Sequence, residues 1–220
     1  MSKTRIEWVK NPDGTQGYSW NPIQGLCPVG CWYCYARGIY KRFKLNPAIT
    51  HIWIKPPKKP SGVFVCSTIE LFHPDIPEEW RDIVFKDIEE RPNHRFYILT
   101  KLPQNIDRPM PDNVWLGTTV TNQMDLSRIT HIELIKAKKR FVSFEPLFGF
   151  IQWEGFRLEF SSLDWIIVGQ LTGHGKKYEP KKYWINQIKF YAGYYGIPLF
   201  MKDNLKEIWG EKLIQEFPNM

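Results

Sequence analysis

Short apolar runs recur along this chain, and most of them are followed by a polar turn and a helical pattern. Apolar runs bounded by turns are typical of buried strands, and helical segments between them indicate parallel strands with covering helices. The expected strands span residues 18–20, 63–66, 95–99, 113–117, 140–144, 163–168 and 197–201. Residues 5–9 alternate between polar and apolar and add a strand-like segment. We therefore predict an α/β fold, a partial (β/α) barrel of about six or seven mostly parallel strands with outer helices.

Helical periodicity predicts the covering helices. They are expected at residues 35–43, 76–88, 126–135 and 180–195, with a terminal helix after residue 204. The third carries Lys136, Lys138, Lys139 and Arg140 at its end, where cations suit the helix dipole. The fourth stops at Gly196, a residue type favoured just past a helix end. Asn204 and Glu207 have the spacing of a capping box for the terminal helix.

Composition places the chain among globular proteins. It has 220 residues, of which 43% are hydrophobic and 15% aromatic, and we expect one domain over residues 1–220. No apolar run reaches the length of a membrane span and the first residues do not resemble a signal peptide, so we expect a cytoplasmic protein with no membrane partner. The net charge of +7 permits nucleic acid as a partner without establishing it.

The cysteines carry the clearest chemical signal. Cys27, Cys31 and Cys34 fall within eight positions, spaced C-x3-C-x2-C, in a loop over residues 25–35. Such a loop can aim three thiolates at one point, and soft thiolates favour iron–sulfur or zinc over hard cations. Three ligands are one too few for a closed tetrahedral site, so a cubane held this way leaves one iron open to a small molecule. The alternative is zinc with Cys66 or a histidine as fourth ligand, although a second C-x2-C pair is absent.

Polar residues also follow the predicted strands where each strand ends. In such folds the active site gathers at the carboxyl ends of the strands, so we expect these side chains to converge with the cysteine loop. The residues are Cys66, Ser67, Glu70, Lys101, Thr118, Glu145, Gln170 and Lys202.

The cysteine spacing resembles the signature loop of the radical S-adenosylmethionine (radical SAM) superfamily, with Tyr33 in the place of the aromatic residue that precedes the third cysteine. Other stretches are similar to a narrower, phage- and prokaryote-encoded radical-SAM-like family of uncharacterised function. These stretches are residues 6–8, 20–22, 34–36, 71–73, 99–101, 141–147 and 164–169. They run through most of the chain in order. Leu171 stands where members of that family often have a carboxylate.

The resemblance implies a [4Fe–4S] cluster on Cys27, Cys31 and Cys34, with S-adenosylmethionine (SAM) on the free iron near Tyr33. It implies a one-electron donor of the flavodoxin or ferredoxin type and reductive cleavage of SAM to a 5′-deoxyadenosyl radical. That radical would take hydrogen from an unknown substrate, for which nucleic acid is one candidate. The Gly-Gly-Glu that holds SAM in many members is missing here. The expected substitutes and further SAM contacts are Ser67, Thr68, Glu70, Thr118, Gln170 and Lys202.

Cys66, Lys101 and Glu145 are the candidate catalytic residues. Only Cys66 lies outside the cysteine triplet, so a second cysteine-ligated cubane is excluded, which leaves lyase, isomerase, repair or activating-type chemistry. Cys66 is either a hydrogen-atom donor or a small buried hydrophobic residue. Lys101, Glu145 and Lys202 either contact SAM or substrate or pair with one another. Two alternatives stay open: a non-catalytic zinc- or cluster-bearing nucleic-acid-binding protein, and a barrel that keeps the cluster without cleaving SAM.

Overall fold

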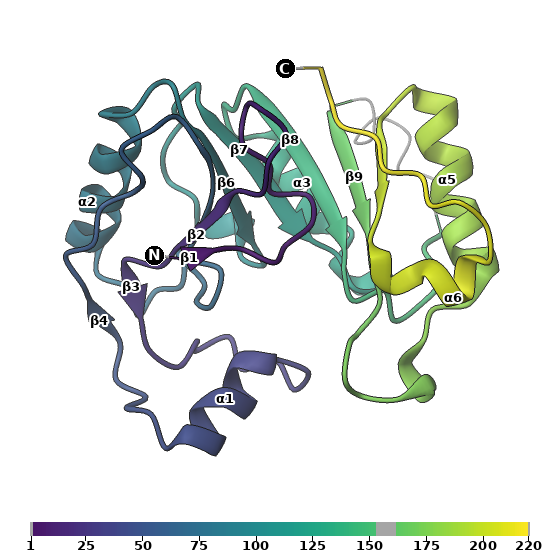
Figure 1. The fold of residues 1–220 in the computed structure, drawn as a ribbon, viewed down its shortest axis with the longest axis horizontal. Helices are drawn as coiled ribbons and strands as arrows, with labels where there is room; N and C mark the ends of the chain where they lie inside the picture. The colour runs from purple at the N-terminus through teal and green to yellow at the C-terminus, as the bar shows by residue number, and fades with distance from the viewer. Residues whose placement is uncertain (1, 153–161, 220) are drawn as a thin grey trace.

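A single eight-stranded sheet organises the molecule, which is described here by a computed structural model over residues 2–152 and 162–219. The order across the sheet is β1-β2-β5-β6-β7-β8-β9-β10. The strands are β1 (Ser2–Lys3), β2 (Tyr18–Trp20), β5 (Gly62–Val65), β6 (Arg95–Thr100), β7 (Val114–Thr119), β8 (Lys139–Phe144), β9 (Trp165–Val168) and β10 (Leu199–Met201). All neighbours from β2 to β10 pair in parallel, and β1 is antiparallel to β2. The seven parallel strands form a half-barrel (Figure 1), which confirms the predicted α/β partial barrel.

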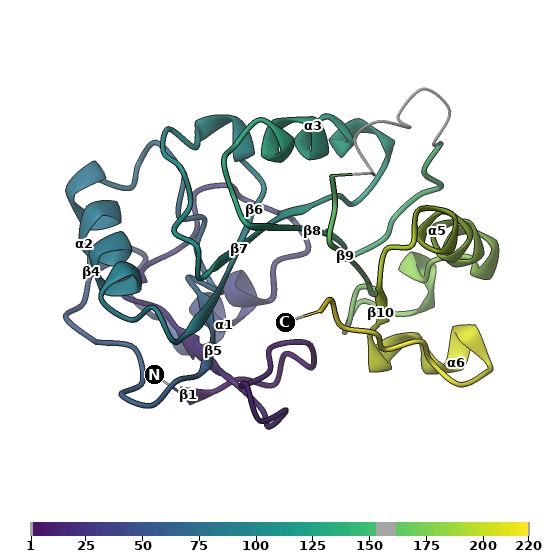
Figure 2. The same ribbon diagram turned by 90° about the horizontal axis from the view of Figure 1, so that it is seen from above.

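Helices cover the outer face of the half-barrel. Figure 2 shows α2 (Glu78–Glu89), α3 (Ser127–Glu133) and α5 (Lys182–Tyr195) around it. Alternate strand residues, such as Val65, Ile98 and Val142, point to these helices and form the larger hydrophobic core. Further elements complete the fold: α1 (Tyr35–Phe43), α6 (Lys206–Trp209), the two-stranded pair β3 (Ile23–Gln24) and β4 (Thr50–His51), and 3-10 turns at Pro103–Asn105, Gln123–Asp125, Lys176–Tyr178 and Asp203–Leu205. Among the helices described, none has the length and apolar character needed to cross a bilayer.

Trp8 fills the inner face of the half-barrel. Its ring lies 5.2 Å from Phe64, 5.5 Å from Tyr97 and 5.9 Å from Trp165, between ring centroids. The strand expected over residues 5–9 is wrong, because the N–H of Val9 donates to the carbonyl of Ile6 (3.1 Å) and closes a turn. The alternating pattern arises because this segment turns its apolar side chains toward the aromatic inner face.

Two helix-end predictions need correction. α3 ends at Glu133, and Lys139 and Arg140 belong to β8. A cation still meets the end of α3, because the Arg140 guanidinium donates to the carbonyls of Ile132 (3.0 Å) and Ile135 (2.7 Å). The side chain of Asn204 does not cap α6, as it bonds to the backbone of Gln170. The helix predicted at 35–43 is confirmed, the one predicted at 180–195 begins two residues later, and Gly196 ends α5 with φ of +64°.

Candidate functional site

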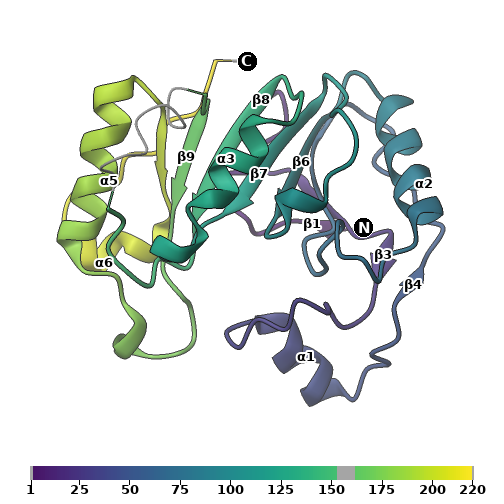
Figure 3. The ribbon, with the colours of Figure 1, turned by 180° about the vertical axis from the view of Figure 1, so that it is seen from behind.

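The cysteine loop, residues 25–35, lies beyond the carboxyl ends of the parallel strands (Figures 1 and 3). Gly25 and Gly30 have φ of +131° and +72°, a backbone conformation that favours glycine. α1 follows the loop directly and folds back on it. The N–H of Gly25 donates to the Tyr40 hydroxyl (3.0 Å), and Arg37 donates to the carbonyl of Cys27 (2.8 Å). The loop is therefore held by the helix that it introduces.

The three loop cysteines are free thiols and only partly buried. Burial raises the pKa of the Cys27 thiol, while hydrogen bonds from the backbone N–H groups of Val29 and Glu70 to its sulfur lower this pKa in part. Such N–H groups are typical partners of metal-bound sulfur. In the part of the chain that the structure describes, no three His, Cys, Asp or Glu side chains are gathered around one point as a metal site. The loop thus fits an iron–sulfur cluster in the kind and number of its donors, and binding would require the three sulfurs to come together.

Five aromatic rings tie the cysteine loop to the other side of the half-barrel. We call this set the aromatic bridge: Trp32, Tyr33, Phe148, His174 and Tyr178. Trp32 stacks on Phe148 (5.4 Å, 24°) and lies 4.9 Å from Tyr178, while Tyr33 meets Phe148 edge-on at 5.1 Å. Burial, followed by the nearby Cys31, raises the pKa of Tyr33. The loop leaves the sheet after β2, whereas Phe148 and Tyr178 follow β8 and β9, so it spans the mouth of the half-barrel.

Two of the predicted strand-end charges meet at this mouth. Glu145, which follows β8, forms an ion pair with Lys202, which follows β10. A third charge joins them, because Glu7 accepts a hydrogen bond from the N–H of Asp203 (3.1 Å). Burial raises the pKa of Glu7, and the Asp203 N–H and Lys202 partly oppose this shift. These groups form a polar cluster at the carboxyl ends of β8, β9 and β10.

Glu70 and Thr118 are occupied by internal hydrogen bonds. The Glu70 carboxylate is buried and accepts from the Thr100 hydroxyl (2.6 Å) and from the N–H groups of Lys101 (2.8 Å) and Phe72 (3.3 Å). Thr118 is fully buried and donates to the carbonyl of Thr100 (3.1 Å). Both side chains fix the end of β6. The ammonium of Lys101 forms no ion pair with the residues described and does not join the Glu145–Lys202 pair.

The remaining predicted residues lie near the ends of β5 and β9. Cys66 is buried among core residues with φ of +52°, and burial raises its pKa to about 12. Ser67 bonds through its N–H (2.7 Å) and hydroxyl to the Asn21 side chain, and Thr68 beside it is half-buried. Gln170 donates to the carbonyl of Asn204, which leaves its own buried side-chain oxygen without a protein partner among the described residues.

Sequence reasoning missed three parts of this site. It did not predict Glu7 in the polar cluster, the bond from Asn21 to Ser67, or the partners of Trp32 in the aromatic bridge. A signal existed for Asn21, since it follows β2 in the same way that the other site residues follow their strands. No such signal exists for the aromatic bridge, because Trp32 and Tyr33 lie more than 100 residues before its other three members in the chain.

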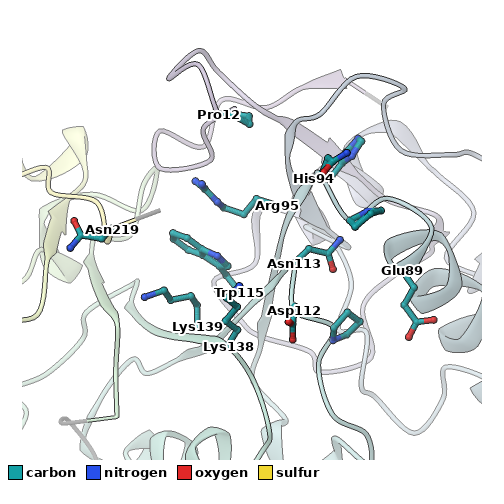
Figure 4. A pocket seen from close by; sticks show the side chains of 13 residues that line it. Pro12, Glu89, His94, Arg95, Asp112, Asn113, Trp115, Lys138, Lys139 and Asn219 are labelled. Carbon is teal, nitrogen blue, oxygen red and sulfur yellow. The ribbon is translucent and has the colours of Figure 1, made fainter.

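A separate surface hollow of about 410 Å³ lies at the opposite, amino-terminal end of the strands. Figure 4 shows its lining, in which the Arg95 guanidinium lies 4.5 Å from the Trp115 ring centroid. Lys139 at its edge pairs with Asp164 (2.8 Å), and Glu89 and Asp112 add acidic groups. None of the predicted site residues lines this hollow, so the candidate chemistry lies at the other end of the half-barrel.

Comparisons with known proteins place the chain in a family without assigning an activity. No curated protein and no solved structure matches it. The family model described as "Protein of unknown function (DUF5131)" matches residues 3–216, which is nearly the whole chain. The protein therefore belongs to the DUF5131 family.

Proposed function

We propose that this protein is a radical SAM enzyme that holds a [4Fe–4S] cluster through Cys27, Cys31 and Cys34. The observation that carries the proposal is the position of the C-x3-C-x2-C loop, which spans the carboxyl-end mouth of a parallel half-barrel. That end of a parallel α/β fold is where ligands bind, and three thiols leave one iron free for a small molecule. Two unrelated features, donor chemistry and fold, thus support one site.

When bound, the cluster and SAM would supply one-electron cleavage of the C5′–S bond and a 5′-deoxyadenosyl radical that takes hydrogen from substrate, with the electron coming from a flavodoxin- or ferredoxin-type donor. The chain's own residues would bind SAM or substrate and enclose the site. Glu145 and Lys202 offer a carboxylate for ribose hydroxyls or an ammonium group and a cation for a carboxylate. The aromatic bridge covers the mouth and limits water around a reactive species.

Internal hydrogen bonds change the roles proposed for two residues. The polar atoms of Glu70 and Thr118 form hydrogen bonds at the end of β6, so we propose that both residues position the backbone around Lys101. Lys101 follows β6, its ammonium forms no ion pair with a described residue, and it is the better candidate for a substrate contact. Cys66 retains its proton at neutral pH, because burial raises its pKa to about 12, and a neutral thiol is the form that a hydrogen-atom donor needs.

The test is anaerobic reconstitution of the full chain with iron and sulfide, followed by dithionite and SAM. We expect about four irons per chain, a brown colour that fades on reduction, and formation of 5′-deoxyadenosine. Cys31→Ala should lose iron and product. Cys66→Ala, which removes a thiol outside the loop, should retain the iron and serves as the matched control.

Two results would count against the proposal in different ways. Tight zinc binding through the loop cysteines without iron uptake would overturn it and favour a zinc-bearing binding protein. A stable cluster with no SAM cleavage, even in the presence of substrate, would support the cluster-binding part of the proposal and contradict the catalytic part.

A further inference from the structure

The positive charge of this protein is concentrated in one segment. Residues 14–69 contain seven lysines and arginines and no aspartate or glutamate, whereas the rest of the chain has 23 basic and 23 acidic residues. The whole net charge of +7 therefore comes from about a quarter of the chain. This segment includes the cysteine loop and α1. Four of the seven cations, Arg37, Lys41, Arg42 and Lys44, lie on α1 or at its C-cap, and a cluster of cations of this kind favours a polyanionic partner.

The residues that the structure describes neutralise few of these charges. Lys55 pairs with Asp87 (2.8 Å), and it is the one member of the seven with an ion pair to a described residue. α1 contains no acidic residue and carries Arg37, Lys41 and Arg42, with Lys44 at its C-cap. The side chains of Lys41, Arg42 and Lys44 are exposed, so their charges face solvent.

Large apolar side chains are exposed on the same helix. Tyr35, Ile39 and Phe43 repeat at four-residue spacing along one side of α1, and they are 63%, 42% and 62% exposed. The Arg42 guanidinium lies 5.4 Å from the Phe43 ring centroid. Trp53, further along the same segment, is 77% exposed. Aromatic rings interleaved with unpaired cations are the features that single-stranded nucleic acids use, since bases stack on the rings and phosphates meet the cations.

We propose that α1 and the segment up to Trp53 bind single-stranded nucleic acid and lead it to the cysteine loop. Lys41, Arg42 and Lys44 contact phosphates, and Phe43 and Trp53 stack on unpaired bases. The path ends at the loop because α1 begins directly after Cys34 and is bonded back to the loop through Arg37 and Tyr40. As an assignment of the enzyme's substrate class, this inference rests on the proposed function. The binding itself does not, because it needs neither iron nor SAM.

The experiment measures binding of a fluorescein-labelled single-stranded oligonucleotide to the full chain by anisotropy at several salt concentrations. Lys41→Gln/Arg42→Gln/Lys44→Gln should weaken binding about ten-fold or more and lower the slope of log K against log salt by about 2, since each single-strand phosphate contact contributes about 0.7. Phe43→Ala and Trp53→Ala should each weaken binding on the order of ten-fold with little change in slope. Lys86→Gln/Lys138→Gln/Lys212→Gln removes the same charge from exposed lysines elsewhere and is the matched control.

Three outcomes would overturn the inference. An equal loss in the control triple would show that overall charge, not this surface, binds the oligonucleotide. Tighter binding to duplex than to single strand would contradict the stacking. Binding to vesicles that contain anionic lipid, with no binding to oligonucleotide, would make α1 a membrane-surface helix. Oligonucleotide binding is measured without iron or SAM. A failure of SAM cleavage would therefore not affect the binding result. A failure of oligonucleotide binding would not affect the test of SAM cleavage.

Discussion

The carboxylate of Glu145 and the ammonium of Lys202 meet directly over Gly169. Glu145 follows β8, Lys202 follows β10, and Gly169 follows β9, the strand between them, so the ion pair bridges the end of β9. A Cβ atom on Gly169 would lie 2.9 Å from Cδ of Lys202 and 3.0 Å from Cδ of Glu145. The pair can form across the end of this strand because the residue that follows the strand has no side chain.

Gly169→Ala should therefore displace the ion pair and destabilise the protein by about 1–3 kcal/mol, the usual range for an added carbon in a packed site. Urea unfolding measures the change in the free energy of unfolding. Gly149→Ala is the control at the same end of the sheet, because the nearest atom to its Cβ would be Cβ of Asn122 at 3.7 Å. Equal effects of the two substitutions would show that the ion pair tolerates the methyl group.

Glu7 should make the stability depend on pH. Burial raises its folded-state pKa above the ordinary value of 4.5, so the folded protein binds this proton more readily than the unfolded chain. Its stabilising contribution is complete below pH 4.5 and is lost as pH rises through the folded-state pKa. Glu7→Gln cannot ionise at this position and avoids the loss of stability. In denaturant unfolding, the stability of the variant relative to wild type should therefore be higher at pH 7 than at pH 4. The exposed Glu79→Gln is the control, and a constant difference between wild type and Glu7→Gln would contradict the expectation.

Glu70→Ala should destabilise the protein by about 2–4 kcal/mol, because it leaves the Thr100 hydroxyl and the Lys101 and Phe72 N–H groups without their shared acceptor. Glu70→Gln should cost less, since the amide keeps one acceptor oxygen. Thermal or urea unfolding gives both values. The exposed Glu89→Gln should change stability by no more than about 0.5 kcal/mol. If Glu70→Ala lowered the stability as little as Glu89→Gln, the carboxylate would not be structural, and the prediction that it contacts SAM would be favoured again.

Trp32→Ala should loosen a segment that lies far from it in sequence. The substitution removes the stacking on Phe148 and the contact with Tyr178, so amide hydrogen exchange should increase in residues 174–178. The expected loss of stability is about 0.5–1.5 kcal/mol for each aromatic contact. Trp53→Ala removes a more exposed ring that contacts His51 and should leave exchange at residues 174–178 unchanged.

Cys66 should resist thiol reagents in the folded protein. A pKa of about 12 leaves only about one thiolate in ten thousand at pH 8, and the side chain is buried. In metal-free protein, mass spectrometry after brief alkylation should show label on Cys31 and Cys34 and none on Cys66 until denaturant is added. Labelling of Cys66 at the rate of Cys34 would mean that it opens to solvent and is available to a substrate.

The sequence pattern predicts the sheet well because parallel strands are buried on both faces and appear as continuous apolar runs. It also predicts that Glu145 and Lys202 lie near each other, since the carboxyl ends of parallel strands share one edge of the sheet. Lys101 stays apart from this pair because β6 is separated from β8 by β7. The prediction of a strand-like segment at residues 5–9 is wrong because a loop that packs on an aromatic face shows the same alternation as a strand. The aromatic bridge depends on tertiary packing between distant segments, which local pattern does not contain.

The position of Trp8 has a consequence for the size of the substrate under the proposed function. Because this ring fills the concave side of the half-barrel, the candidate residues lie at the rim, near the carboxyl ends of the strands and the cysteine loop. A rim can be approached sideways by the middle of a long polymer, without threading of a free end and without engulfing the molecule. Under the proposed function, the rim would therefore meet one unit of an uninterrupted strand.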